Sequence, residues 1–483
     1  MAAIETLAVF PGGGGAGDRL IGAWAGRFFD LSRQYEEGDT RRTRIPPPDG
    51  FPTLFTSSRW HFDTITNSAG TVFLVLANGS DPPVRYSTQV DNAGLHSAQV
   101  SLHSSYQRET EDPQFGDFDA GRMAGCLHFK NRLWWWERGR RRLWFGEIQS
   151  PGGQLTPFPI AAAARDLGEV VSLGSISRDG GDGPDDYLVI LFSSGSALVY
   201  QGTDPTNIET FAIVGRFFVG NPVGYRPLLP YGGDLLVLCE SGVIPISVVL
   251  SGAGIKRSDF ITDAVRGAWD DAVRAEGSAG AWQGLAMPNG QALIFNIPQS
   301  DDTDGYGMGR QFVLNTITGA WCEYRGWHAG ALASYSGSLF YSHAEAPEVY
   351  EADVPELQVD AGGKPIKFLS QSAFSYMPNP GRFGVYRGGE GVAKRANGIT
   401  PQIEGAGKTG LQIACLSDFQ GIRHNTRWSR FEVGDGLAQR RRVSINAVGN
   451  ALSPVIRSAG GDANSPIRFY NLSLEYTVSG RLR

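Results

Sequence analysis

Short apolar runs that are separated by tight turns dominate the chain from about residue 56 to residue 355. The runs lie on either side of dipeptides such as Asn78-Gly79 and Lys130-Asn131. These dipeptides supply the positive φ angles that short hairpin turns need. The pattern therefore predicts strand–turn–strand units. The other four turns of this kind are Ser194-Gly195, Gly232-Gly233, Asn289-Gly290 and Ser336-Gly337.

The six turns recur at an average spacing of about 52 residues. A unit of about 40–50 residues with several strands is the period of a β-propeller blade. A small sheet cannot cover both of its faces alone, and stacking sheets around an axis buries those faces. The spacing therefore predicts a propeller of about six blades, although any glycine-rich β-protein would contain such turns.

Residues 1–55 follow a different pattern. Apolar residues in residues 18–33 (DRLIGAWAGRFFDLSR) are one, three and four positions apart, which predicts a short helix. A charged stretch and the proline-rich sequence IPPPDGFP follow, and proline ends a helix. We therefore expect an N-terminal arm with a short helix and a linker.

Longer strands of alternating pattern occupy residues 356–483. Examples are KFLSQSAFSYM, GLQIACLSDF, RWSRFEVG and IRFYNLSLEYTV. They predict a separate β-sandwich. The expected protein is all-β, with an arm (1–55), a β-propeller (56–355) and a C-terminal β-sandwich or platform domain (356–483).

Composition and charge narrow the possible functions. The net charge is -6, whereas an electrostatic nucleic-acid binder would show a basic footprint. The four cysteines are far apart and form no CxxC, which predicts free buried thiols and argues against a metal or redox motif. No run of apolar residues is long enough for a membrane span, and the N-terminus lacks a standard signal peptide.

Two glycine-rich stretches have the outline of nucleotide-binding motifs. Residues 12–17 fit GxGxxG, but no second strand with a terminal acid follows, so a flexible arm is favoured. Residues 405–409 (GAGKT) resemble the end of a phosphate-binding loop, but residue 402 is Gln where the first glycine should be. We predict no cofactor.

Metal-binding and catalytic motifs are equally incomplete. The aspartate-rich residues 301–305 and 179–186 have calcium-loop character, but Gln311 replaces the bidentate glutamate of the first. The histidines show no metal-ligand spacing, and no GxSxG occurs. A glycosidase carboxylate pair cannot be located from the sequence, because its members come from different strands. We therefore predict no metal ligand and name no catalytic residue.

A basic run follows three consecutive tryptophans at the tip of a predicted hairpin. Arginine beside aromatic residues is typical of an interface with a protein or a phosphate backbone. A solvated turn is the alternative. The candidate interface residues are Trp134, Trp136, Arg138, Arg140, Arg141 and Arg142.

Residues 198–247 resemble the tail nozzle (tail tubular, or hub) proteins of short-tailed bacteriophages. The matching elements are VYQGTDP, the G-x-P-x-G-x-R pattern from Gly220 to Arg226, and GGDLLVL followed by SG-x-x-P-I-S. The resemblance is clearest over about 60 residues and extends loosely to the C-terminal SGRL. The N-terminal region has no counterpart in the family pattern.

The resemblance implies a function as well as a fold. It implies six copies in a ring below portal and adaptor proteins, with tail fibre or spike proteins outside. Duplex DNA would pass through the ring's channel, which closes before infection, without specific binding. The protein would be made in the host cytoplasm, reside in the virion tail and have no enzymatic activity. A net-negative chain suits such a conduit.

Two other functions stay open. A glycan-binding or glycan-cleaving propeller would use the tryptophans and the aspartate clusters. A propeller that serves as a scaffold for protein partners is also possible, because propellers host many functions.

Overall fold

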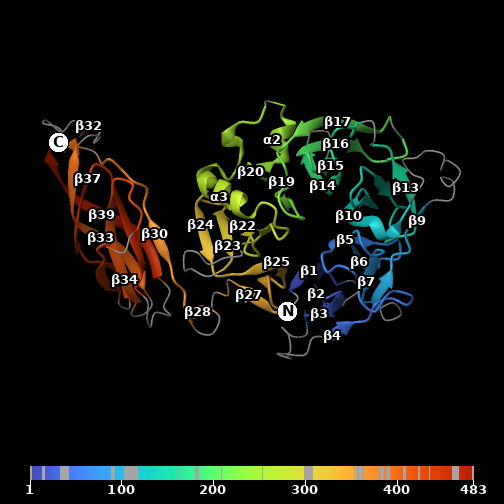
Figure 1. Ribbon diagram of the computed structural model, residues 1–483, viewed down its shortest axis with the longest axis horizontal. Coiled ribbons are helices and arrows are strands. Elements are labelled where there is room, and N and C mark those ends of the chain that lie inside the picture. The colour runs from blue at the N-terminus through green and yellow to red at the C-terminus, as the bar shows by residue number, and fades with distance from the viewer. Residues whose placement is uncertain are drawn as a thin grey trace. The chain divides into compact units, whose positions relative to one another are not determined.

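The computed structural model divides the chain into two compact units, Met1–Asp353 (unit 1) and Val354–Arg483 (unit 2). Each unit is built almost entirely of strands (Figure 1). The structure describes residues 3–12, 17–32, 43–88, 93–102, 118–160, 163–179, 184–207, 209–252, 254–298, 308–352, 354, 359–360, 364–377, 379–380, 386–387, 392–405, 409–422, 425–433, 436–459 and 467–480.

The described part of unit 1 contains seven sheets in chain order, here called blades 1 to 7, whose strands are antiparallel except for β9 of blade 3. Blade 1 has strands β1 (Ile4–Phe10), β2 (Arg19–Trp24), β3 (Arg27–Asp30) and β4 (Thr43–Ile45). Blade 2 has β5 (His61–Thr66), β6 (Val72–Ala77), β7 (Val84–Ser87) and β8 (Gly94–Ser97). Blade 3 has β10 (Met123–Phe129), β11 (Arg132–Glu137), β12 (Leu143–Phe145) and β13 (Gln154–Phe158), with β9 (Ser101–Leu102) parallel to β13.

The remaining blades follow the same plan. Blade 4 has β14 (Val170–Asp179), β15 (Pro184–Phe192), β16 (Ser196–Gly202) and β17 (Phe211–Phe218). Blade 5 has β18 (Leu228–Tyr231), β19 (Asp234–Cys239) and β20 (Gly242–Pro245), followed by helices α2 (Ile246–Leu250) and α3 (Arg266–Glu276). Blade 6 has β21 (Gln283–Ala286), β22 (Ala292–Ile297), β23 (Arg310–Asn315) and β24 (Trp321–Arg325). Blade 7 has β25 (Ala329–Tyr335), β26 (Ser338–His343) and β27 (Val349–Ala352).

Seven hydrophobic clusters join these blades into a closed ring. Each cluster takes its side chains from two neighbouring blades, and the last joins blade 7 to blade 1. Both faces of each blade are buried in this way, as the physics of a propeller requires. Figure 1 shows the ring, with the blue first blade beside the gold last blade. The prediction of an all-β propeller is confirmed.

The N-terminal residues form blade 1, so the predictions of an arm at residues 1–55 and of a helix at residues 18–33 are wrong. The supposed helix is β2 and β3, joined by a turn in which Ala25 and Gly26 have φ of 48° and 68°. Leu20 packs towards blade 7 and Ile21 towards blade 2. A strand that is buried on both faces has apolar residues at adjacent positions, which here matched a helical spacing by chance.

This first blade also explains the blade count. The six turns found in the sequence each lie between strands of one blade, in blades 2 to 7. Ala25-Gly26 is the seventh turn, which the helix assignment hid. The ring has seven blades and not about six.

The ends of the ring are joined by hydrogen bonds as well as by apolar contacts. The Ser342 hydroxyl donates to the carbonyl oxygen of Ile4 at 2.7 Å and accepts from the Ala331 amide at 2.9 Å. The Tyr335 hydroxyl donates to the Asp18 carbonyl oxygen at 3.2 Å. Blades 1 and 7 are thereby held together, although blade 1 is formed by the N-terminal end of unit 1 and blade 7 by its C-terminal end.

Unit 2 is a β-sandwich, which confirms the predicted fold of the C-terminal region. One sheet has β30 (Leu369–Gln371), β38 (Leu452–Ser458), β34 (Thr409–Ser417) and β35 (Ser429–Val433) in that order. In the other, β33 (Ala393–Gly405) pairs with β36 (Gly436–Arg440), β37 (Val443–Gly449) and β39 (Ile467–Gly480). Their inner faces share one core that includes Ile399, Ile413, Phe431 and Ile456. Two short hairpins complete the described strands of unit 2: β28 (Val359–Asp360) with β29 (Lys364–Pro365), and β31 (Asn379–Pro380) with β32 (Tyr386–Arg387).

Candidate active site at the centre of the propeller

Polar side chains from blades that are not neighbours meet at the centre of the ring. We call Glu5, Arg59, His61, Asp63, Tyr225 and Arg226 the axial cluster. Tyr225 and Arg226 precede β18 of blade 5, and their partners belong to blades 1 and 2 and to the segment that leads into blade 2. In a ring of seven blades, a contact between blade 5 and blades 1 and 2 must cross the middle.

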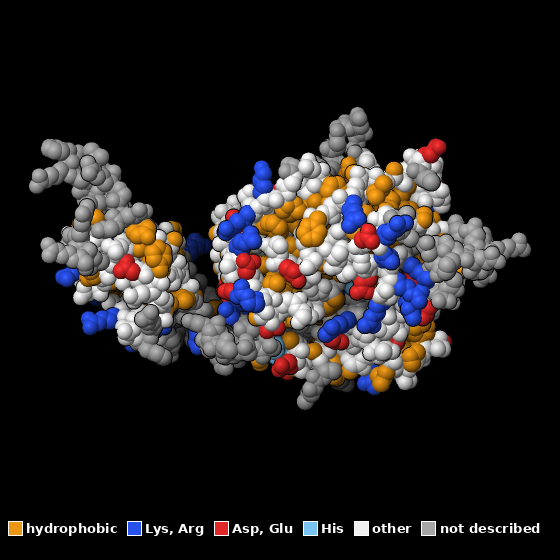
Figure 2. Space-filling view, turned by 45° about the horizontal axis from the view of Figure 1, so that its top comes forward, with side chains coloured by type: hydrophobic (Ala, Val, Ile, Leu, Met, Phe, Trp, Pro, Cys, Tyr) orange, Lys and Arg blue, Asp and Glu red, His pale blue; other side chains and the backbone are white. Residues whose placement is uncertain are grey.

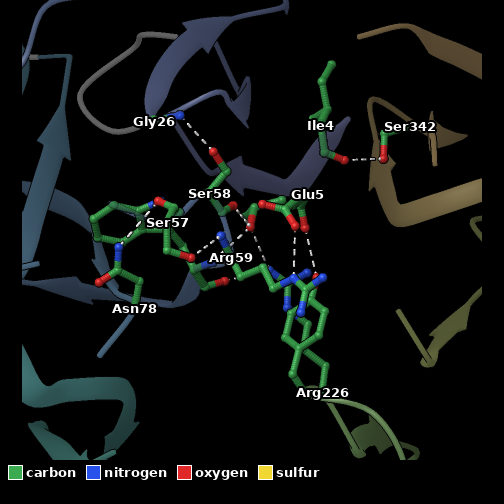
Figure 3. A network of polar contacts seen from close by, with 12 residues as sticks. Ile4, Glu5, Gly26, Ser57, Ser58, Arg59, Asn78, Arg226 and Ser342 are labelled. Atoms are coloured by element: carbon green, nitrogen blue, oxygen red, sulfur yellow. Dashed lines mark hydrogen bonds and ion pairs between the residues drawn. The ribbon is translucent and has the colours of Figure 1, made fainter. Parts of the chain in front are cut away.

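Hydrogen bonds and one ion pair involve four members of the cluster, of which Figure 3 labels Glu5, Arg59 and Arg226. The Tyr225 hydroxyl donates to the carbonyl oxygen of Glu5 at 2.8 Å. Nη2 of Arg226 donates to the carbonyl oxygen of Trp60 at 2.5 Å. Nε of Arg59 lies 2.9 Å from Oε1 of Glu5. The Glu5 carboxylate therefore lies near the start of β1 with a cation beside it.

Arg226 has a free hydrogen-bonding atom. Among the described residues, its Nη1 is buried and has no partner. The guanidinium lies over two aromatic rings, 5.0 Å from the centre of Phe62 and 5.1 Å from that of Tyr225. A buried polar group without a partner is uncommon in native proteins and calls for an explanation. A ligand oxygen at the ring centre would supply that partner.

His61 is held as a neutral imidazole. Its ring centre is 5.1 Å from that of Trp136 and 6.0 Å from that of Tyr225, both in edge-to-face geometry. Burial, and to a lesser extent the charge of Arg226, lowers the pKa of His61 to about 3. At neutral pH this ring can donate or accept a hydrogen bond but carries no charge.

Asp63 lies two residues after His61 on β5, so both side chains leave the same face of the strand. Its carboxyl accepts hydrogen bonds from the amides of Thr64 at 2.7 Å and His128 at 2.6 Å. Burial nevertheless raises the pKa of Asp63 above its ordinary value. A carboxyl group whose pKa is raised in this way can hold and deliver a proton.

The tryptophans predicted as interface residues are part of the core, so their assignment to an interface is wrong. Trp134 and Trp136 are only 1% and 2% exposed. They belong to the cluster between blades 3 and 4. Side chains buried this completely offer no surface to a partner.

The four arginines make contacts within unit 1. Arg140 and Arg142 form ion pairs with the buried Glu137 at 3.3 and 3.7 Å. Arg138 donates to the Ser80 hydroxyl at 2.8 Å, and Arg141 donates to the carbonyl oxygens of Ala164 and Arg165. These contacts tie the turn of blade 3 to blade 2 and to the segment before blade 4. Arg138 and Arg141 are exposed, and whether they bind a partner stays a prediction.

The other sequence motifs contribute nothing to this site. Residues 13–16, 180–183, 299–307 and 406–408 lie outside the described residues. Asp186, at the end of one aspartate cluster, pairs with Lys130 and Ser177. In the parts of the chain that the structure describes, no group of three or more His, Cys, Asp or Glu could hold a metal ion.

The sequence did not reveal the axial cluster. Its residues come from three distant stretches of the chain, at residues 5, 59–63 and 225–226, and only ring closure brings these stretches together. Arg226 is the one partial exception, because it ends the G-x-P-x-G-x-R pattern.

On the face of unit 1 shown in Figure 2, Lys and Arg side chains are interspersed with Asp and Glu. Within the described ranges, no helix is long and apolar enough to cross a membrane.

Comparisons with known proteins give matches only among solved structures. No family model and no curated protein matches the chain. An exo-β-1,3-galactanase from Phanerochaete chrysosporium with galactose is 11% identical, with 89% of this chain and 98% of that one covered and a TM-score of 0.31. A variant of that galactanase with β-1,3-galactotriose is 8% identical, with 90% and 98% covered and a TM-score of 0.29. A Bacteroides fragilis protein assigned as a 6-phosphogluconolactonase is 11% identical, with 73% and 94% covered and a TM-score of 0.34.

These matches contradict the prediction of a structural phage-tail component without enzymatic activity. The structures named above are a galactanase and a protein assigned as a lactonase, and none of them is a phage-tail component. Sequence identities and TM-scores this low assign no functional residue and no substrate to this chain. Nothing in the comparisons bears on the resemblance to tail nozzle proteins, on the hexamer and its portal, adaptor, fibre and DNA partners, or on a virion location, and these stay predictions.

Proposed function

We propose that the chain is a glycan-cleaving β-propeller whose axial cluster is the active site. One observation carries the proposal: the first strands of blades 1 and 2, β1 and β5, each carry a carboxyl group, Glu5 and Asp63, in a different environment. Asp63 is partly buried and its pKa is raised, whereas Glu5 pairs with Arg59. Glycosidases use such a pair, with one group protonated and the other ionised.

The surrounding residues have functions in this scheme. Asp63 would donate its proton to the oxygen of the glycosidic bond as the bond to the leaving sugar breaks. The Glu5 carboxylate would stabilise the positive charge that develops on the sugar ring, or remove a proton from the attacking water. Nη1 of Arg226 would donate a hydrogen bond to a sugar oxygen, and the Tyr225 ring would offer an apolar face. The neutral ring of His61 would serve as a further hydrogen-bonding group.

Release of reducing ends from a panel of polysaccharides tests the proposal, with β-1,3-galactan as the first substrate because of the galactanase named above. The variants are Asp63→Asn, which cannot donate the proton, and Glu5→Gln, which removes the charge. Each should lower kcat by about 10²- to 10⁴-fold, the usual contribution of an acid or base catalyst. Asp271→Asn is the control, since Asp271 is exposed on α3.

Three results would count against the proposal. Hydrolysis that persists in both variants would place the chemistry elsewhere. Absence of both binding and hydrolysis across the panel would remove the glycan-directed function. The wild type could also bind a glycan without cleaving it, and lose that binding in Arg226→Met. The axial cluster would then be a binding site and not an active site.

A further inference from the structure

Three aromatic side chains form an exposed group on unit 2. We call Phe374, Tyr376 and Phe419 the aromatic platform. The ring centre of Phe419 is 4.8 Å from that of Phe374 and 6.2 Å from that of Tyr376. Phe419 is 63% exposed and Tyr376 is 39% exposed. The platform thus presents aromatic surface to solvent instead of burying it.

The platform has a firm base on the outer face of the sandwich. Phe374 and Trp428 pack on a small cluster from β34 and β38 that consists of Ala414, Leu416 and Val455. The guanidinium of Arg457 lies 3.9 Å from the centre of the Trp428 ring. A surface whose side chains are already packed loses little conformational freedom when a ligand binds.

The backbone beneath the platform adopts unusual conformations. Asp418 and Phe419 have φ of 49° and 60°, and Met377 has φ of 45°. Residues with side chains seldom adopt such angles, and clusters of them are typical of binding sites. The Asp418 carboxylate holds the turn, because it accepts from the amides of Asn450 at 2.7 Å and Ala451 at 3.1 Å. The strained turn directs the Phe419 side chain towards solvent, where it contributes little to the packing of the fold.

An unused hydrogen-bond acceptor lies beside the same turn. Oδ1 of Asn450 is buried and, among the described residues, has no partner. The backbone oxygen of Asn450 accepts from Nζ of the buried Lys394 at 2.8 Å. An aromatic group on a turn and an unpaired acceptor on the residue that is bonded to that turn match a ligand that has one apolar face and a rim of hydroxyl groups.

We propose that the aromatic platform is a saccharide-binding site, separate from the axial cluster. A pyranose ring would stack its C–H face on Phe419 and Tyr376 and donate a hydroxyl to Oδ1 of Asn450. Ligand sites commonly combine apolar surface with a few placed polar groups in this way. A protein partner would leave the Asn450 acceptor without an obvious function.

Calorimetric titration of the full-length chain tests this site. The background is Asp63→Asn, which leaves the ligand intact if the axial cluster cleaves it. The probes are soluble β-1,3-galactan and β-1,3-galactotriose, with maltoheptaose and a chitin hexamer as other saccharides. Phe419→Ala should weaken binding at least tenfold, and Phe419→Trp should restore it. Ile366→Ala is the control, because Ile366 is an equally exposed apolar residue of unit 2.

Tyr376→Ser provides a second test if Phe419→Ala does not fold. Equal affinity in Phe419→Ala and the background, or no binding of any probe, would overturn the proposal. Self-association that depends on Phe419, seen by sedimentation without saccharide binding, would show a protein interface and overturn it as well. The two sites fail separately: Phe419→Ala should keep hydrolysis of galactotriose, and Asp63→Asn should keep binding at the platform.

Discussion

The indole of Trp136 lies directly against Gly125, its partner residue in the pairing of β10 and β11. A Cβ at residue 125 would be 2.1 Å from Cη2 of Trp136 and 2.8 Å from Cβ of His61. The absence of a side chain at this position lets the indole reach the His61 ring of blade 2. One glycine thus shapes both the core of blade 3 and the wall of the axial cluster.

Gly125→Ala should destabilise the protein strongly, because a methyl group has no room between the Trp136 indole and the His61 side chain. We expect a loss of about 3 kcal/mol, at the upper end of the usual cost of overpacking. Urea unfolding measures the change. Gly267→Ala is the control, since nothing lies within 4 Å of a Cβ there and the residue belongs to α3. Equal stability of the two variants would contradict the packing described above.

Ring closure should depend on Ser342. Ser342→Ala leaves the Ile4 carbonyl and the Ala331 amide without a buried hydroxyl partner. A buried group that loses its partner costs about 1–3 kcal/mol. Ser251→Ala removes a similar hydroxyl bond at an exposed site and should change the free energy of unfolding by less than about 0.5 kcal/mol. A small effect in Ser342→Ala would mean that apolar packing alone closes the ring.

Stability should fall as the pH decreases below about 6.5, the ordinary pKa of histidine. Folded His61 has a pKa of about 3, so between these values the unfolded chain binds a proton that the folded chain does not. The free energy of unfolding then rises with pH, by up to about 1.4 kcal/mol per unit for one proton.

Denaturant titrations between pH 5 and pH 7.5 measure this slope. His61→Asn should have a shallower slope than the wild type. Asp63 acts in the opposite sense, because its raised pKa makes the folded state bind a proton first as the pH falls. The comparison between variant and wild type isolates the part due to His61, and identical slopes would contradict a buried neutral imidazole.

The charge of Arg226 should be visible in the titration of His61. Arg226 is the second cause of the low pKa of His61, after burial. Arg226→Met should therefore raise that pKa, and burial should still hold it below 6.5. NMR of protein labelled at histidine measures the shift, with His61→Asn to assign the signal. Arg257→Met, at an exposed arginine, is the control. A His61 signal that is unchanged by Arg226→Met would show that the charge of Arg226 does not influence the pKa of His61.

The hairpins could be predicted because their signal is local. A two-residue turn needs residues that tolerate positive φ, as Lys130-Asn131 and Gly232-Gly233 do in the structure. Ala25-Gly26 obeys the same rule but was missed, because a strand that is buried on both faces has an apolar pattern like that of a helix. The tryptophans of β11 were misassigned for a related reason, since sequence does not distinguish a buried aromatic run from an exposed one.

The candidate sites could not be predicted, because distant segments build them. The Tyr225 hydroxyl and the Glu5 carbonyl are 220 positions apart in the chain. Asp63 gains its raised pKa from burial, which no neighbour in the sequence specifies. The aromatic platform likewise joins Phe374 to Phe419 through a turn whose backbone angles depend on Asp418 and its contacts.

The sequence by itself determined that the chain is built of strands, where most hairpins turn and that a second β-domain follows the propeller. These properties depend on side-chain alternation and on the backbone freedom of a few residues, which act over short range. Only the tertiary structure decided that seven blades close the ring and which carboxyl and guanidinium groups meet at its centre. The physical reason is that burial and ring closure depend on contacts between residues far apart in the chain.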